Sequence, residues 1–109
     1  MSGEALERQQ PAYPLGCVQT AFANDHFQAT VRVLRHLDLR GWNTGTIRLC
    51  IRSLEPVDFY KSQRHLDRPD VWLDIYKPVF CDERLYVKFT LLEDGTYLVL
   101  SFCGDGEEH

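Results

Sequence analysis

Apolar residues in the first half of the chain recur every three or four positions, which is the spacing of helices that bury one side. The repeats predict helices over residues 15–22, 31–39 and 44–54, with a short strand at 27–29 after the first of them. Thr30 and Asn43 are favourable N-caps for the second and third helices, and Gly41 is a favourable residue to end the second. Pro56 ends the third helix, because the residue before a proline avoids the helical conformation.

In the second half of the chain the pattern alternates between apolar and polar residues, as in strands with one buried face. Four strands are predicted, over residues 57–64, 71–79, 84–92 and 97–103. Asp94-Gly95 predicts a two-residue hairpin turn between the last two strands. Such a turn sets Tyr86 opposite Cys103, and it sets Lys88 opposite Ser101.

The predicted hairpin has one core face and one face that is available for function. The core face is expected to hold Leu85, Val87, Phe89, Leu91, Leu98, Leu100 and Phe102. The other face carries Arg84, Tyr86, Lys88, Thr90, Val99, Ser101 and Cys103. Helices followed by consecutive strands predict an α+β domain of two layers, with the N-terminal helices packed on an antiparallel sheet of about four to six strands.

The register of the second predicted strand has two solutions. A two-residue turn at Cys81-Asp82 sets Lys77 opposite Tyr86. It also brings Leu73 to the same face as Tyr86. A turn one residue longer would instead bring to that face Trp72, Asp74 and Tyr76. The polarity of these residues favours the longer turn, but it does not settle the register.

The chain has 109 residues, which is enough for one domain with its own core. Residues 15–103 are expected to form that domain, between a flexible lead-in at residues 1–14 and an acidic tail at residues 104–109. The net charge is −4, but much of the acidity lies near the ends, so the middle of the chain can still carry a basic patch. No apolar run approaches the ~20 residues that span a bilayer, and the polar start does not resemble a signal peptide. A cytoplasmic protein without membrane contact is therefore predicted.

Cysteine and histidine are too scattered to predict a metal site. The cysteines are Cys17, Cys50, Cys81 and Cys103, and no two of them form a Cys-x-x-Cys pair. The four histidines do not supply clustered ligands either. Four reduced thiols are expected, with no metal and no cofactor.

Three strand-like pieces each carry a tyrosine and a lysine one or two positions apart: Tyr60-Lys61, Tyr76-Lys77, and Tyr86 with Lys88. Taken alone, such alternation is most often an ordinary solvated face. Tyrosine and lysine together can, however, stack on a base, hold a phosphate and move a proton. Lys61, Lys88 and Arg84 are the candidate cations. Tyr86 or Tyr60 is the candidate for proton transfer, because a lysine with an ordinary pKa near ~10.4 is a poor base at neutral pH.

Four separated motifs strengthen this interpretation. They are Asp58-Phe59-Tyr60-Lys61-Ser62, Trp72 with Asp74 and Tyr76, Tyr86-Val87-Lys88 with Thr90, and Leu100-Ser101-Phe102. Together they resemble the MqsR toxins of bacterial type II toxin–antitoxin systems. The resemblance implies a RelE-like fold and an endoribonuclease that cleaves mRNA, inhibits translation and growth, and is neutralised by a cognate antitoxin. It also implies that Lys61 and Tyr86 are catalytic.

The resemblance and the strand pattern together give the residues expected to contact single-stranded mRNA. They are Tyr60, Gln63, Arg64, Trp72, Tyr76, Lys77, Arg84 and Lys88. Three positions depart from the family pattern, because Leu73 replaces a glutamine, Cys103 replaces a lysine and Gln63 replaces a methionine. The family's glutamine favours the shorter turn at Cys81-Asp82. The departures also define an alternative function, that of a weakened family member that binds an antitoxin or RNA as a regulator.

Overall fold

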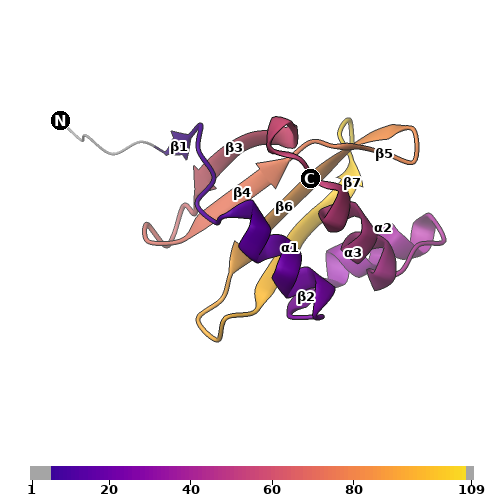
Figure 1. Ribbon diagram of the computed structural model, residues 1–109, viewed down its shortest axis with the longest axis horizontal. Coiled ribbons are helices and arrows are strands. Elements are labelled where there is room, and N and C mark those ends of the chain that lie inside the picture. The colour runs from indigo at the N-terminus through magenta and orange to yellow at the C-terminus, as the bar shows by residue number, and fades with distance from the viewer. Residues whose placement is uncertain (1–5, 108–109) are drawn as a thin grey trace.

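The computed structural model describes residues 6–107 of the chain (Figure 1). Its helices are α1 (Leu15–Ala23), α2 (Val31–Leu39) and α3 (Thr44–Ser53), followed by a 3-10 turn, η1 (Pro56–Asp58). Its strands are β1 (Glu7–Arg8), β2 (Phe27–Ala29), β3 (Phe59–Arg64), β4 (Trp72–Tyr76), β5 (Val79–Phe80), β6 (Glu83–Leu91) and β7 (Tyr97–Gly104). The α+β class predicted from the sequence is confirmed.

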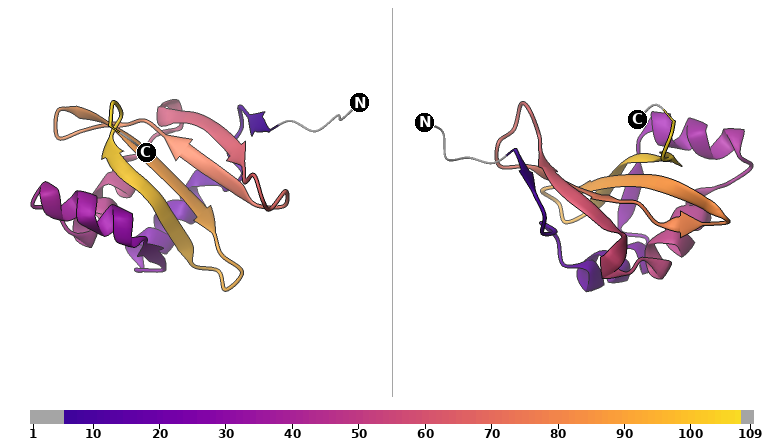
Figure 2. Two further views of the ribbon diagram at one scale, coloured as in Figure 1. Left: turned by 180° about the vertical axis from the view of Figure 1, so that it is seen from behind. Right: turned by 90° about the horizontal axis from the view of Figure 1, so that it is seen from above.

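The strands form one sheet in the order β1-β3-β4-β6-β7-β2, with β5 paired to β6. α1 and α3 cover one face of this sheet, while α2 packs against β7 at its edge (Figures 1 and 2). The described residues contain seven strands, more than the four to six expected, because β1 and β5, with two residues each, are too short to show an alternating pattern. The sheet is also mixed, because β2 pairs in parallel with β7.

The helix ends follow the predicted capping residues. The Thr30 hydroxyl accepts a hydrogen bond from the Val33 N–H at 3.2 Å, which begins α2. The Asn43 side chain accepts one from the Gly45 N–H at 2.8 Å, which begins α3. Gly41 follows α2 with a φ of +70°, a conformation that glycine adopts without strain.

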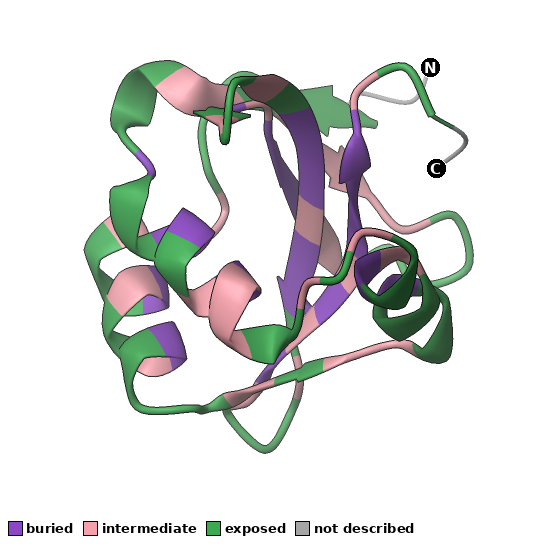
Figure 3. Ribbon diagram, turned by 90° about the vertical axis from the view of Figure 1, so that its right-hand side faces the viewer, coloured by how far each residue is buried: buried purple, intermediate pink, exposed green. Residues whose placement is uncertain are grey.

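The core lies between the helices and the sheet (Figure 3). Fully buried helix residues include Val18, Phe22, Ile47, Cys50 and Ile51. They pack on strand residues that include Tyr76, Leu85, Val87, Phe89, Val99 and Phe102. We call the sheet face that points away from α1 and α3 the outer face. It carries a second, smaller cluster of buried residues formed by Ile75, Tyr86 and Cys103.

The β6–β7 hairpin has the predicted strand pairing but not the predicted two-residue turn. Its loop has three residues, because the Leu92 N–H binds the Thr96 carbonyl oxygen at 2.8 Å, and Gly95 adopts a φ of +89°. The strands therefore start one residue out of the predicted register, with Leu91 opposite Tyr97.

A β-bulge then corrects this offset. Lys88 pairs with Ser101 while Phe89 pairs with Val99, so Leu100 is the extra residue. Beyond the bulge Tyr86 lies opposite Cys103, and both functional pairings predicted from the sequence are confirmed.

The bulge also changes which side chains face the core. The predicted core face is correct for Leu85, Val87, Phe89 and Phe102. It is wrong for Leu100 at the bulge and Leu98 beyond it, which do not belong to the core cluster, whereas Leu91 pairs with the core residue Tyr97 but is 39% exposed at the end of β6. Val99, predicted on the other face, is fully buried in the core instead.

The turn at Cys81-Asp82 has two residues, which settles the register of β4. Both residues have positive φ values, 53° and 62°, as the tightest hairpin turns require. Tyr76 pairs with Val87, so Lys77 comes opposite Tyr86 in the next position. Ile75 accordingly faces outward, whereas Tyr76 belongs to the core.

Asp74 ties the expected lead-in to the sheet. Its fully buried carboxylate accepts hydrogen bonds from the Ala12 N–H at 2.9 Å and the Tyr13 N–H at 3.0 Å. The Tyr13 hydroxyl donates to the Trp72 carbonyl oxygen at 2.7 Å. Leu6 to Arg8, and also Ala12 and Tyr13, thus contact the sheet, while residues 1–5 lie outside the described part of the chain.

Replacing Asp74 is expected to destabilise the domain. In Asp74→Ala two backbone donors lose a charged acceptor, so the free energy of unfolding should fall by about 2–4 kcal/mol. Urea denaturation measures this change. Asp67→Ala, at an exposed loop position, serves as the control and should change stability by less than about 0.5 kcal/mol. Equal stability of the two variants would contradict the role assigned to Asp74.

Candidate functional site

The outer face brings together lysines from strands that are distant in sequence. Lys61 of β3 pairs with Ile75 of β4, which pairs with Lys88 of β6, which pairs with Ser101 of β7. Paired residues point to the same side of a sheet, so these four side chains form one row across the outer face. Tyr86 lies two positions from Lys88, in the neighbouring row.

Tyr60 sits between the two rows because of a second bulge. Phe59 pairs with Tyr76 and Lys61 pairs with Ile75, so Tyr60 is the extra residue of β3. The ammonium of Lys77 lies 3.8 Å from the centre of the Tyr60 ring and 6.0 Å from that of the Tyr86 ring. The Lys61 ammonium is 5.3 Å from the Tyr60 ring. These cation–π contacts gather two tyrosines and two lysines from β3, β6 and the end of β4.

Lys61 is paired with a carboxylate. Its Nζ lies 2.5 Å from the Oε2 atom of Glu7, which β1 places beside it. This hydrogen bond raises the pKa of Lys61, against the opposite effect of its partial burial. Lys61 is therefore held as a cation and is suited to bind a phosphate oxygen, but not to accept a proton at neutral pH.

Tyr86 and Lys88 have pKa values displaced in opposite directions. Burial raises the pKa of Tyr86, although the charge of Lys61 lowers it in part. Tyr86 thus keeps its proton and can donate it. Burial lowers the pKa of Lys88, and the nearby Arg32 of α2 lowers it further. Of the two lysines in the row, Lys61 and Lys88, Lys88 is therefore the better proton acceptor.

Cys103 is fully buried opposite Tyr86, and its burial raises the pKa of its thiol. It is therefore a neutral side chain where a cation was expected from the family pattern. The charge of Arg32 acts on both Cys103 and Lys88, so α2 contributes a cation near this end of the site. Arg32 and Glu7 were not predicted, because their proximity depends on how α2 and β1 dock onto the sheet.

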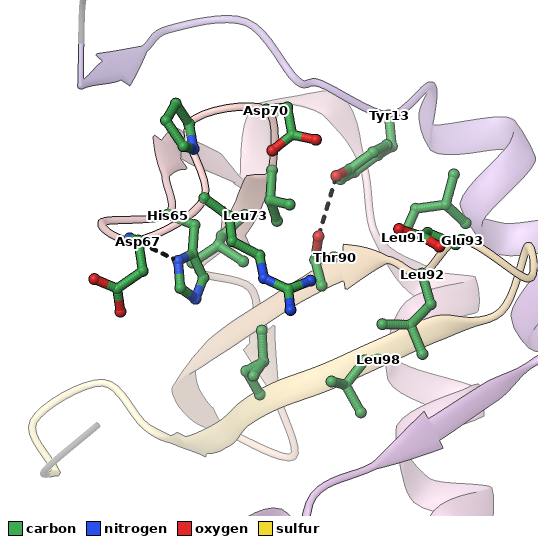
Figure 4. Close-up of a pocket in the computed structure, with 14 residues that line it drawn as sticks. Tyr13, His65, Asp67, Asp70, Leu73, Thr90, Leu91, Leu92, Glu93 and Leu98 are labelled. Carbon is green, nitrogen blue, oxygen red and sulfur yellow. Dashed lines mark hydrogen bonds between the residues drawn. The ribbon is translucent and has the colours of Figure 1, made fainter.

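An open cavity of about 1140 Å³ adjoins the lysine row (Figure 4). Its apolar lining includes Leu73, Leu98 and Leu100, and its polar lining includes His65 and Arg68 of the β3–β4 loop. The Tyr13 and Thr90 hydroxyl groups are hydrogen-bonded at 3.1 Å on one side of it. Leu73 pairs with Gln63, which lies two residues along β3 from Lys61 and therefore points to the same side. The cavity and the lysines thus share the outer face.

The other predicted site residues are divided between the two faces. Gln63 shares the outer face with Lys61, and Arg84 is exposed, where it donates to the Lys77 carbonyl oxygen at 3.1 Å. Three residues lie on the opposite side of the sheet from Lys61: Arg64, Trp72 and Tyr76. Tyr76 is fully buried against Phe89, and Trp72 is covered by the Arg8 guanidinium at 3.8 Å. We do not include these three in the site.

No group of three or more histidine, cysteine or acidic side chains within residues 6–107 is arranged to hold a metal ion. All four cysteines are free thiols, with Cys17 and Cys81 exposed and Cys50 and Cys103 buried. Across the same residues, none of the helices is both long enough and apolar enough to cross a membrane.

Comparison with known proteins identifies a family and a relative of this chain. The family described as motility quorum-sensing regulator, toxin of MqsA, matches residues 10–104. The mRNA interferase toxin MqsR of Escherichia coli (strain K12) is 27% identical over 97 residues, which cover 89% of this chain and 97% of that protein. The family match spans the outer-face lysines, Tyr86 and the cavity, but it begins after β1.

The two lysines of the row should titrate in a defined order. As the pH rises, Lys88 is expected to lose its proton before Lys61, since burial lowers the pKa of Lys88 while Glu7 raises that of Lys61. NMR titration of the lysine side chains measures both. Glu7→Gln should bring the Lys61 transition to lower pH and leave that of Lys88 in place. The reverse order of titration would contradict the assigned environments.

Proposed function

This chain belongs to the MqsR toxin family, and on that basis we propose that it is the toxin of a type II toxin–antitoxin pair. We propose further that it cleaves single-stranded mRNA without a metal ion and so inhibits translation and growth. A cognate antitoxin protein is its proposed partner. The observation that carries the proposal is the convergence of Lys61, Lys88 and Tyr86 on the outer face, within the segment that matches the family.

The proposed reaction is an attack by the ribose 2′-hydroxyl on the adjacent phosphate. Lys88 accepts the hydroxyl proton, and the new bond from the 2′-oxygen to phosphorus forms as the bond to the 5′-oxygen breaks. Tyr86 donates its proton to that leaving oxygen. Lys61 stabilises the negative charge that develops on the other phosphate oxygens. The products of this step are a 2′,3′-cyclic phosphate and a 5′-hydroxyl.

The surroundings of these three residues suit an RNA strand. Lys77 and the exposed Tyr60 ring lie on one side of them, where they can contact the backbone and stack on a base. The cavity lies on the other side, with an apolar floor that fits a base removed from its stack. Only unpaired nucleotides can enter such a cavity, so we propose a single-stranded substrate.

The proposal extends to the fold relationship and the location. Helices on one face of a largely antiparallel sheet support a RelE-like domain over residues 15–103. Cleavage of mRNA implies a cytoplasmic protein.

The alternative of a weakened member rests on two departures from the family pattern. Leu73 is 8% exposed and apolar where the family has a glutamine, and Cys103 is neutral where the family has a lysine. The chain would then bind its antitoxin or RNA but cleave slowly. Arg32 offsets the second departure in charge, which favours the active form of the proposal.

Lys61→Ala is expected to abolish growth arrest and to lower RNA cleavage by ~10²–10³-fold, which is typical for the loss of one group that stabilises transition-state charge. The variant should fold normally, because Lys61 is a partly exposed strand residue. Cleavage of a mixed-sequence RNA in EDTA measures the effect and tests metal independence together. Arg48→Ala on α3, with an exposed ion pair to Asp25, is the control. A folded Lys61→Ala variant with unchanged cleavage would end this assignment.

Leu73→Gln restores the family residue and is expected to raise cleavage several-fold if that departure weakens the site. The amide would add hydrogen-bonding groups to the cavity beside the lysine row. Leu49→Gln makes the same change at an exposed position of α3 and should have no effect. If both variants match the wild type in single-turnover cleavage, Leu73 does not limit the reaction.

A further inference from the structure

Strand β1 lies along the free edge of β3, beside the proposed RNA site. Glu7 pairs with Gln63 and Arg8 pairs with Ser62 in an antiparallel arrangement. The Arg64 N–H donates to the Leu6 carbonyl oxygen at 2.8 Å, which extends the pairing by one hydrogen bond. This arrangement aims the Glu7 carboxylate at Lys61, where the oxygen-to-nitrogen distance is 2.5 Å.

Arg8 anchors the strand on the other face of the sheet. Its guanidinium lies 3.8 Å from the centre of the Trp72 ring, a cation–π contact. β1 therefore makes a side-chain contact on each face of the sheet. Glu7 contacts Lys61 on the outer face, and Arg8 contacts Trp72 on the face that α1 and α3 cover. Residues 6–9 precede the segment that matches the family.

A carboxylate on Lys61 occupies the place that an RNA phosphate needs. Both are anions whose oxygens accept charge-assisted hydrogen bonds from an ammonium, and one lysine cannot bind both at full strength. The contact is also weak enough to be exchanged. The Lys61 and Glu7 side chains are 21% and 50% exposed, and ion pairs at such positions stabilise little. β1 itself has only two residues.

We propose that β1 is a built-in competitor of RNA, and that its Glu7 carboxylate must leave Lys61 before a phosphate can bind there. The inference rests on the proposed function, because it assigns Lys61 to RNA. It goes further in naming a segment of the chain that lowers the affinity of the site. Removing the carboxylate should raise RNA affinity, and RNA should in turn detach β1 from the edge of β3.

A different role for Glu7 gives the opposite result. If its carboxylate accepted the 2′-hydroxyl proton, Glu7→Gln would lower cleavage while leaving affinity unchanged or improved. If Glu7 only held Lys61 in position, Glu7→Gln would lower both affinity and cleavage. Competition alone predicts that both rise.

The test compares wild type, Glu7→Gln and Glu55→Gln, all as the full chain. Glu55 is an exposed residue before η1, so its variant makes the same chemical change away from the site. Affinity is measured with a short single-stranded RNA that carries 2′-O-methyl groups and cannot be cleaved, and rate with the unmodified RNA. Glu7→Gln should bind roughly 2- to 10-fold more tightly and cleave faster at subsaturating RNA, the range expected for the loss of one exposed ion pair. Glu55→Gln should match the wild type.

Two further measurements isolate the mechanism. In a Lys61→Ala background Glu7→Gln should have no effect, because the competed cation is gone. Amide hydrogen exchange at Arg64, whose N–H binds the Leu6 carbonyl oxygen, should speed up when wild type is saturated with the methylated RNA.

The outcomes separate the two proposals. The competitor role alone would be overturned by two results together. Wild type and Glu7→Gln would bind RNA with equal affinity, and RNA would leave hydrogen exchange at the Arg64 amide unchanged. Slower cleavage by Glu7→Gln would overturn it as well. No binding and no cleavage by either protein would overturn the proposed function, and the competitor role with it.

Discussion

Strand β6 pairs with β4 on one side and with β7 on the other, and these two registers determine which side chains share the outer face. A slip of one residue would move every side chain of a strand to the opposite face. The two-residue turn at Cys81-Asp82 fixes the first register, and the bulge at Leu100 fixes the second. The lysine row, the position of Tyr86 and the floor of the cavity all depend on these two local features.

Much of this arrangement could be predicted from the sequence, and the limits have physical causes. Helices α1 to α3 were predictable because Thr30 and Asn43 are strong caps and the apolar period is clear. The pairing of Tyr86 with Cys103 was predicted from a two-residue turn, although the protein combines a three-residue loop with a bulge. The loop shifts the register by one residue and the bulge shifts it back, so the predicted pairing was right. The prediction that Leu98 and Leu100 face the core was wrong. A bulge shifts the phase of the alternation by one residue, but residues 97–100 are apolar at every position, so the shift could not be seen in the sequence.

The candidate site, too, could be predicted from the sequence only in part. Lys61, Tyr86 and Lys88 were identified from local motifs, and the sheet places them on one face. Glu7 and Arg32 were not identified, because each reaches the site from a separate element whose docking no local motif encodes. Tyr76 carried a motif signal but belongs to the core, where burial raises its pKa to about 12. A motif residue can thus serve the fold that presents the site rather than the site itself.

The charges near the site explain how an acidic protein can hold several cations on one face. Lys61 is paired with Glu7, and Lys77 lies 3.3 Å from the carboxylate of Asp105. These carboxylates reduce the mutual repulsion of the lysines while the site is empty, and the Glu7 carboxylate is half exposed. The ion pairs of Arg40 with Glu83 and Glu107 differ, because one guanidinium binds two acidic side chains and joins α2 to β6 and the end of the chain. Phosphate can replace a single exposed carboxylate far more readily than it can break such a shared pair. Under the proposed function, the ion pair of Lys61 is therefore expected to exchange for an RNA phosphate before those of Arg40, because Lys61 has one carboxylate partner and that partner belongs to a two-residue strand.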